Sequence, residues 1–407
     1  MDAMKTIRAQ IAALRRQDDE WCAQHFEGWT RVTFLIAKSM RPISRRLKAV
    51  HKMVEHLRLY GQAVRSMTGV GLGRQALQQY RGAVRHRIPP EKYYLYSLYN
   101  DPARMDQYIP ARPWIRLLET LLSVQGTDEA ALLHDKRASY RHFSKHGLPI
   151  LPVLAEFENG VTVPRQWTAN APLPKCDLFS KPTGGRQGEG ARRWIFIGEA
   201  DKYRTEEGEL VSQNELLGRL EAQSLRDVIL LQERAHNHPR LQALTGPTLA
   251  AMRIVTMRPP GGDPEYLTGL IGLPLKDMVA NNFIPEYDVI GAPIDDETGR
   301  LGAAYRKKLD QVMEPIDIHP TSGERIKGFR LPDWSAAKRL ALRGHRTLSN
   351  IALVGWDIAL TADGPVIIEG NKTPGGDSPQ VAHKEPWGAT RFPALYSKNL
   401  QVALQGG

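Results

Sequence analysis

The chain has 407 residues, of which 42% are hydrophobic and 24% charged. These are the proportions of a globular protein with room for two or three domains. Two cysteines, Cys22 and Cys176, are too few for a disulfide framework, and the start of the chain lacks the apolar run of a secretory signal or membrane span. We therefore expect a cytoplasmic protein.

Residues 1–126 are predicted to form a basic, mainly helical domain. Residues 1–100 contain eighteen Lys and Arg against seven Asp and Glu, an excess equal to the net charge of +11 of the whole chain. This asymmetry indicates an anionic partner, such as a membrane surface. Residues 2–24 have a heptad stripe of apolar residues, which is also typical of a helix that packs on its own protein or on a second copy in a homodimer. We do not expect a nucleic-acid partner.

Three other features of this region receive structural interpretations. Apolar residues at helical spacing predict a second helix over residues 42–63, with Leu47, Val50, Val54 and Leu57 on one stripe. The glycines of GVGLG (69–73) follow no strand, so we interpret them as a flexible connection. The tyrosines of YYLYSLY (93–99) are expected to pack in a core, because they lack the basic interleaving of RNA-binding modules.

A change of pattern after Thr127 predicts a helix that ends at Gly147, with Asp135 as its N-cap and Lys136 in its first turn. The helix dipole disfavours a cation at that end. Lys136 is therefore either a ligand for an anion or an ordinary solvated lysine.

A glycine-rich loop follows between two predicted strands, 177–181 and 193–197. It contains Gly184, Gly185, Gly188 and Gly190. Such glycines let backbone N–H groups wrap anionic oxygens, although the same segment could be an ordinary flexible hairpin. The arrangement strand, loop, strand is not that of a Walker motif, which needs a helix after the loop.

Two apolar strands are predicted next, over residues 228–234 and around Arg253 in AMRIVTM. An arginine within a buried strand needs an anion, which is either a phosphate or acyl phosphate, or a carboxylate of the core. Residues 259–330 are harder to interpret. They contain His319, Arg325 and Lys327, which either face an acceptor substrate or belong to a lid or to surface hairpins.

The segment VGWDIALTADGPVIIEGN (354–371) has the composition of a β-hairpin, and a three-residue loop places Gly364 at a positive φ. With that register Asp357 lies opposite Glu369, and Asn371 shares their face. Carboxylates among apolar residues need compensation, and Asp, Glu and Asn oxygens suit Mg²⁺. The alternative is a surface hairpin with solvated acids.

Several of these motifs, in this order, resemble those of the ATP-grasp superfamily. The similarity spans roughly residues 90–390, and VGWDIALTADGPVIIEGN more specifically resembles the sugar-transfer-associated branch. IEGNKTPGGD is also similar to a segment of D-alanyl-D-alanine ligases, and NNF (281–283) to an asparagine-containing segment of relatives. The resemblance implies an α+β fold of two lobes that clasp ATP: residues 127–230 with a glycine-rich flap, residues 231–390 with the metal site and acceptor region, and a tail over 391–407.

The resemblance also implies roles for single residues. Lys136 and Lys181 bind phosphates beneath the glycines of the flap, and Gln232 and Glu233 recognise adenine and ribose, although many relatives have Glu-Lys at this point. Arg253 binds phosphate or an acyl phosphate. Asp357 holds one Mg²⁺, Glu369 bridges two ions, and Asn371 holds the second.

By the same resemblance, the function is that of an ATP- and Mg²⁺-dependent carboxylate–amine ligase. It forms an amide through an acyl phosphate, and joins an amino acid or similar acid to an amine of a sugar, peptide or specialised metabolite. Two alternatives are an ATP-grasp kinase that phosphorylates a hydroxyl and a binding module that only senses nucleotide.

Overall fold

The computed structural model describes residue 9 and residues 28–125, 128–167, 171–184, 189–279, 289–306 and 314–405. The chain divides into two compact units. The first comprises residues 1–124, 305–315 and 375–407, and the second residues 125–304 and 316–374. The expected helix over residues 2–24 lies, apart from Ala9, outside the described residues.

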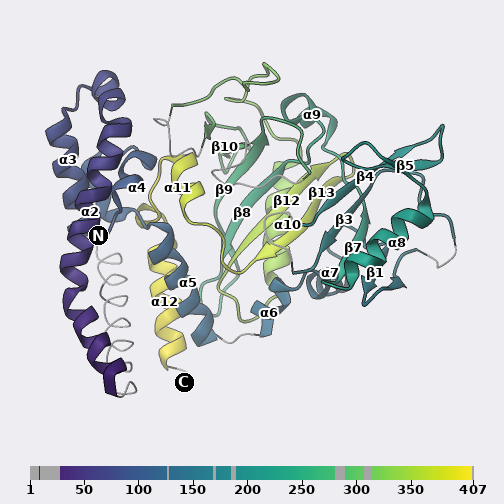
Figure 1. Ribbon diagram of the computed structural model, residues 1–407, viewed down its shortest axis with the longest axis horizontal. Coiled ribbons are helices and arrows are strands. Elements are labelled where there is room, and N and C mark those ends of the chain that lie inside the picture. The colour runs from purple at the N-terminus through teal and green to yellow at the C-terminus, as the bar shows by residue number, and fades with distance from the viewer. Residues whose placement is uncertain are drawn as a thin grey trace. The chain divides into compact units, whose positions relative to one another are not determined.

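The first unit is mainly helical (Figure 1). Its elements are α2 (Gly28–Thr68), α3 (Leu72–Arg81), the π-helical turn η1 (Gly82–His86), α4 (Pro90–Leu95), the 3₁₀ helix η2 (Pro102–Gln107), α5 (Ala111–Gln125), β11 (Tyr305–Arg306), α11 (Asp377–His383), the 3₁₀ helix η3 (Trp387–Ala389) and α12 (Phe392–Gln405). Helix α2 extends beyond the predicted range 42–63 at both ends and runs through Pro42.

The glycines of GVGLG form a tight turn between α2 and α3 rather than a flexible connection. Gly69 has a φ of +74°, Gly71 is the N-cap of α3, and Gly73 already lies inside that helix. The tyrosines at 93, 94, 96 and 99 are at most 5% exposed, as expected for packing residues.

The C-terminal residues form helix α12 and not a tail, because their aromatic side chains complete the core of the first unit. Phe392 and Tyr396 are fully buried, and Trp114 stacks on Trp387 with ring centroids 4.5 Å apart. The carboxylate of Asp377 accepts from Lys92 Nζ at 2.6 Å and from the hydroxyl of Tyr96.

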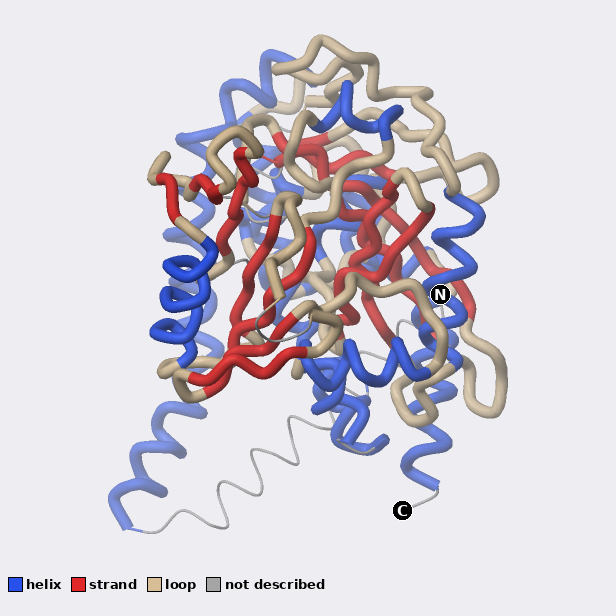
Figure 2. The backbone as a smooth tube through the Cα atoms, turned by 90° about the vertical axis from the view of Figure 1, so that its right-hand side faces the viewer, coloured by secondary structure: helices blue, strands red, loops and turns tan. Residues whose placement is uncertain are grey.

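The second unit contains two antiparallel sheets (Figure 2). The first sheet has the order β2-β1-β7-β3-β4-β5-β6, and the second contains β10-β9-β8-β12-β13. The strands are β1 (Ala155–Glu158), β2 (Val161–Pro164), β3 (Leu178–Pro182), β4 (Arg192–Ile197), β5 (Lys202–Arg204), β6 (Leu210–Val211), β7 (Ile229–Glu233), β8 (Ala251–Met257), β9 (Glu265–Pro274), β10 (Val289–Pro293), β12 (Leu353–Thr361) and β13 (Gly364–Asn371).

Helices in the second unit pack against these sheets. They are α6 (Asp128–His134), α7 (Lys136–Lys145), α8 (Gln213–Ser224), α9 (Pro239–Thr245) and α10 (Trp334–Arg346). Helix α8 begins with a capping box formed by Ser212 and Glu215, and buries Leu216 and Leu220 in the core of the first sheet. Helix α10 packs on β8, β12 and β13, where Gly344 leaves room for the buried ring of Trp356.

The segment between α7 and β1 connects the two sheets. Ile150 forms a parallel bridge with Ile367 on β13, and Leu154 donates its N–H to the carbonyl of Leu231 on β7 at 2.8 Å. These two contacts join the sheet that contains β3 and β7 to the sheet that contains β12 and β13, within the same compact unit. No helix in the described part of the chain is both long and apolar enough to cross a membrane.

Candidate nucleotide and metal site

Arg253, Asp357 and Glu369 form one row across three neighbouring strands. Asp357 on β12 pairs in register with Arg253 on β8 and with Glu369 on β13. Paired residues of a sheet project from the same face. The three side chains therefore lie together, although β8 and β13 are more than a hundred residues apart in the chain.

The predicted pairing of Asp357 with Glu369 is confirmed, but the turn differs from the expectation. Thr361 pairs with Gly364, so the loop has two residues instead of three, and Gly364 has a φ of +107°. A bulge next to Ile358 leaves Ile368 unpaired. This extra residue restores the register that a longer turn would have given.

Asn371 completes this group of side chains. Its Nδ2 donates to Asp357 Oδ2 at 3.3 Å and to Glu369 Oε1 at 3.2 Å. Asn371 pairs with Gly355, where a Cβ would come within 2.5 Å of Pro374 and 3.4 Å of the Arg253 side chain. Glycine at 355 therefore keeps the space between Asn371 and Arg253 open.

Arg253 and Asp357 form an enclosed ion pair. Nε and Nη2 of Arg253 lie 2.5 Å from Oδ1 and 3.0 Å from Oδ2, and the two side chains are only 28% and 16% exposed. Burial raises the pKa of Asp357 to about 6, with Arg253 opposing and Glu369 adding to the shift. Of the two anions we proposed for Arg253, the carboxylate is the one that it contacts here.

Two lysines, Lys181 of the first sheet and Lys136 of α7, act on the carboxylate of Glu369. Burial lowers the pKa of Lys181 on β3 to about 8, with Glu369 opposing and Lys136 adding to the shift. Burial raises the pKa of Glu369, but Lys181, Lys136 and Arg253 outweigh it and leave that pKa below its usual range. Glu369 is therefore close enough to Lys136, Lys181, Arg253 and Asp357 to interact with each of them.

Lys136 occupies the first position of α7, as expected. Asp135 caps the helix by accepting from the N–H groups of Arg137 and Ala138. Nζ of Lys136 donates to the carbonyl of Thr183 at 3.1 Å, at the beginning of the glycine-rich loop. This hydrogen bond to a carbonyl oxygen offsets part of the unfavourable interaction between the Lys136 ammonium group and the helix dipole.

The glycine-rich flap, which we define as β3, β4 and the loop between them, has the expected strands. Gly184 donates its N–H to Asp227 Oδ2 at 3.2 Å, and Gly190 has a φ of +72°. Gly185 and Gly188 lie outside the described residues. The sequence reasoning missed Asp227, whose position just before the apolar strand β7 was its only signal.

The two polar residues predicted at the end of β7 differ in exposure. Gln232 is 3% exposed, and its Nε2 donates to the carbonyl of Leu151 at 2.8 Å. Its Oε1 is buried and has no hydrogen-bond partner among the described residues. Glu233, the next residue, has an exposed side chain.

The sequence model of the sugar-transfer associated ATP-grasp family matches residues 121–389. The chain belongs to this family. The fold is that of ATP-grasp proteins, α+β with two sheets, here together with N-terminal helices.

Solved ATP-grasp structures resemble this chain at low identity. They include D-alanine–D-alanine ligase from Bacillus anthracis in complex with ATP, which is 13% identical, with a TM-score of 0.35 over 68% of this chain and 69% of the ligase. D-alanyl-alanine synthetase A from Vibrio cholerae is 10% identical, with a TM-score of 0.39 over 69% and 68%. An ADP complex of N5-carboxyaminoimidazole ribonucleotide synthetase is 13% identical, with a TM-score of 0.35 over 69% and 58%. No curated protein matches the chain.

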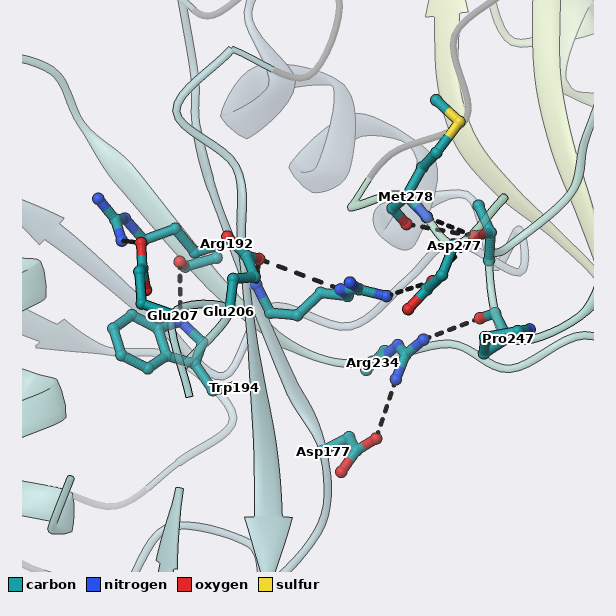
Figure 3. Close-up of polar contacts among 12 residues, drawn as sticks. Asp177, Arg192, Trp194, Glu206, Glu207, Arg234, Pro247, Asp277 and Met278 are labelled. Atoms are coloured by element: carbon teal, nitrogen blue, oxygen red, sulfur yellow. Dashed lines mark hydrogen bonds and ion pairs between the residues drawn. The ribbon is translucent and has the colours of Figure 1, made fainter. Parts of the chain in front are cut away.

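A polar network joins the two sheets of this ATP-grasp protein, in part through the flap strand β4 (Figure 3). Arg193 on β4 donates from Nη1 to Asp277 Oδ1 at 2.6 Å, and Asp277 follows β9 of the other sheet. Arg234 donates to Asp177 Oδ2 at 3.1 Å and to the carbonyl of Pro247 at 2.8 Å. No local pattern indicates these contacts, because each partner is distant along the chain.

The hydrogen bonds and ion pairs described for His319, Arg325 and Lys327, the candidates for an acceptor pocket, include no residue of this site of the ATP-grasp fold. His319 is 2% exposed, and its Nδ1 and Nε2 bond to backbone groups of Ser322 and Pro274. Arg325 and Lys327 are exposed. The segment 281–283 lies outside the described residues. Within the described ranges no group of three or more His, Cys, Asp or Glu is placed to hold a metal ion.

Proposed function

We propose that the protein is an ATP- and Mg²⁺-dependent carboxylate–amine ligase. One observation carries the proposal: Lys136, Lys181 and Arg253 all act on Glu369, while Arg253 also pairs with Asp357 and Lys136 bonds to the start of the glycine-rich loop. Three cations suit a triphosphate, and two carboxylates with an amide suit the metal ions that accompany it.

The donor set fits Mg²⁺ because every side chain in it offers oxygen. Asp357 would hold one ion, Glu369 would bridge two, and the amide oxygen of Asn371 would hold the second. When bound, the ions neutralise charge on the β- and γ-phosphates. Asn371 now donates its Nδ2 to both carboxylates, so metal binding requires its amide to turn.

The remaining groups fit the rest of the nucleotide. Lys136 would exchange the carbonyl of Thr183 for a phosphate oxygen, and Lys181 would supply a second cation to the same phosphates. Gln232 Oε1, buried without a partner, would accept from the exocyclic amine of adenine. Glu233, exposed beside it, would accept from a ribose hydroxyl.

The reaction that we propose needs no covalent protein intermediate. A carboxylate oxygen of the acid attacks the γ-phosphorus, and the bond to the ADP oxygen breaks to give ADP and an acyl phosphate. A neutral amine then attacks the acyl carbon, phosphate leaves, and the nitrogen loses a proton to give the amide. We propose an amino acid or similar acid as the first substrate, and an amine of a sugar, peptide or specialised metabolite as the second.

The test uses the purified protein with ATP, Mg²⁺, hydroxylamine and a panel of amino acids and sugar acids. Hydroxamate formed in step with ADP from one acid supports acyl-phosphate chemistry. Lys181→Met should abolish this product, whereas Lys202→Met, which changes an exposed lysine on β5, should leave it unchanged. ADP release without hydroxamate would favour the kinase alternative, and tight ATP binding without ADP release would favour a nucleotide sensor.

A further inference from the structure

The first unit contains a long stretch without a single acidic residue. Between Glu55 and Glu91 the chain has no Asp or Glu, and its six arginines are all exposed: Arg58, Arg65, Arg74, Arg81, Arg85 and Arg87. None of the six forms an ion pair with a residue of the described part of the chain. This part of the surface therefore has a positive charge that the described residues leave uncompensated.

Helix α3 and η1 add an apolar stripe to this charge. Leu77, Tyr80 and Val84 are 48%, 37% and 38% exposed. At about 100° per residue in α3, Leu77 and Tyr80 lie about 60° apart, and Arg74 and Arg81 lie directly beside Leu77. Val84 and Arg85 follow in the wider π-helical turn η1 and continue the apolar and the basic group. We call these six residues the α3 surface.

The opposite side of α3 is fixed to the core, so the α3 surface is not a face left over from loose packing. Gln75 is fully buried, donates from Nε2 to the carbonyls of Gly61 and Val70, and accepts from the hydroxyl of Tyr94 at 2.9 Å. Gln79, one turn later, is 1% exposed. These contacts set the rotation of the helix and hold the apolar stripe outward.

We propose that the α3 surface binds the anionic phospholipid surface of a membrane. An arginine strip beside an apolar stripe on one helix matches the boundary between headgroups and acyl chains, where arginine meets phosphate and a tyrosine ring lies at headgroup depth. A nucleic acid would engage the arginines but has no need of Leu77 and Val84. The α3 surface is thus the proposed binding site for the anionic partner that the charge of the N-terminal domain predicts.

The experiment is co-sedimentation of the full chain with vesicles of phosphatidylcholine, with and without phosphatidylglycerol. We expect binding only to the anionic vesicles. Arg81→Gln/Arg85→Gln and Leu77→Ser/Val84→Ser should each weaken it by about tenfold or more, because charge and apolar contact both contribute. The matched control is Leu225→Ser/Arg226→Gln, which removes an exposed leucine and an exposed arginine from the second unit and should bind like the parent protein.

Unchanged thermal melting and ATP binding would show that the variants remain folded. The proposal is overturned if the anionic vesicles do not sediment the parent protein, or if the control lowers binding as much as the α3 variants. It is also overturned if the serine variant keeps full vesicle binding, or if single-stranded DNA competes with vesicles and the serine variant binds that DNA normally. The last result would identify the surface as a nucleic-acid site.

Discussion

Arg253 donates two hydrogen bonds to Asp357 across neighbouring strands, and the two side chains are only 28% and 16% exposed. Arginine can hold a carboxylate in this forked geometry, whereas lysine supplies a single point of charge. The pair therefore fixes the orientation of a carboxylate that we propose as a metal ligand.

Arg253→Lys should preserve the charge but lose the fork. We expect this variant to keep most of its thermal stability and to bind ATP with Mg²⁺ about tenfold more weakly. Arg253→Met leaves Asp357 without a counter-ion and should cost about 2 kcal/mol of unfolding free energy. Calorimetric titration with ATP and thermal melting measure the two effects. Equal ATP affinity in the parent and the lysine variant would contradict the positioning role.

Glu369→Gln removes one charge and keeps the shape of the side chain. The amide oxygen still accepts from Asn371, so the fold should be retained. We expect the Mg²⁺-dependent part of ATP binding to disappear, together with ADP release, because a neutral oxygen cannot bridge two cations. Asp363→Asn, in the exposed turn of the same hairpin, is the control and should behave like the parent. Full activity of the glutamine variant would remove the metal assignment.

The hairpin of β12 and β13 shows how far the sequence determines this site. Alternating apolar residues around Asp357 and Glu369 identify the hairpin, and the two carboxylates face each other as predicted. The turn was predicted wrongly because the extra residue is Ile368, which is bulged in the strand, and not Gly364, which was expected in the loop. A two-residue turn with a bulge and a three-residue turn without one give the same pairing of Asp357 with Glu369. Composition alone therefore cannot distinguish the two arrangements.

Contacts between distant strands were beyond the reach of the sequence. Asp357 is the partner of Arg253 because β8 lies beside β12, and no local pattern states which strands become neighbours. The same reason hid Asp227 and Asp277. The flap, the helix cap at Asp135 and the strand β7 depend on neighbouring residues and were predicted correctly.

The ion pair between Arg193 and Asp277 should slow the release of ATP, because it ties the flap strand β4 to the segment after β9. The side chains are 15% and 50% exposed, so we expect the ion pair to contribute about 0.5–1 kcal/mol to the barrier for ATP release. Arg193→Gln should raise the ATP dissociation rate about threefold in stopped-flow measurements. Arg192→Gln, whose partner Glu207 lies within the same sheet region, should leave the rate unchanged. A double-mutant cycle with Asp277→Asn that shows no coupling would contradict this role.

Buried His345 should make the second sheet less stable in acid. Its Nε2 bonds to the carbonyl of Ile351 at 2.9 Å, and its Nδ1 to the hydroxyl of Thr256 at 2.7 Å, which accepts in turn from Trp356. Burial lowers the pKa of His345 from 6.5 to about 4. Between these values the unfolded chain binds a proton that the folded chain does not, so stability is full above pH 6.5 and is lost as the pH falls towards 4.

The expected loss from His345 between pH 7 and pH 5 is about 2 kcal/mol. Hydrogen exchange of the β8 and β12 amides should report it as a lower opening free energy at pH 5. In His345→Asn, which is less stable at pH 7 but cannot titrate, this pH dependence should shrink by about that amount. The control His134→Asn changes an exposed histidine of the same unit and should keep the parent's dependence. An identical pH dependence in parent and His345→Asn would mean that other groups control the acid response.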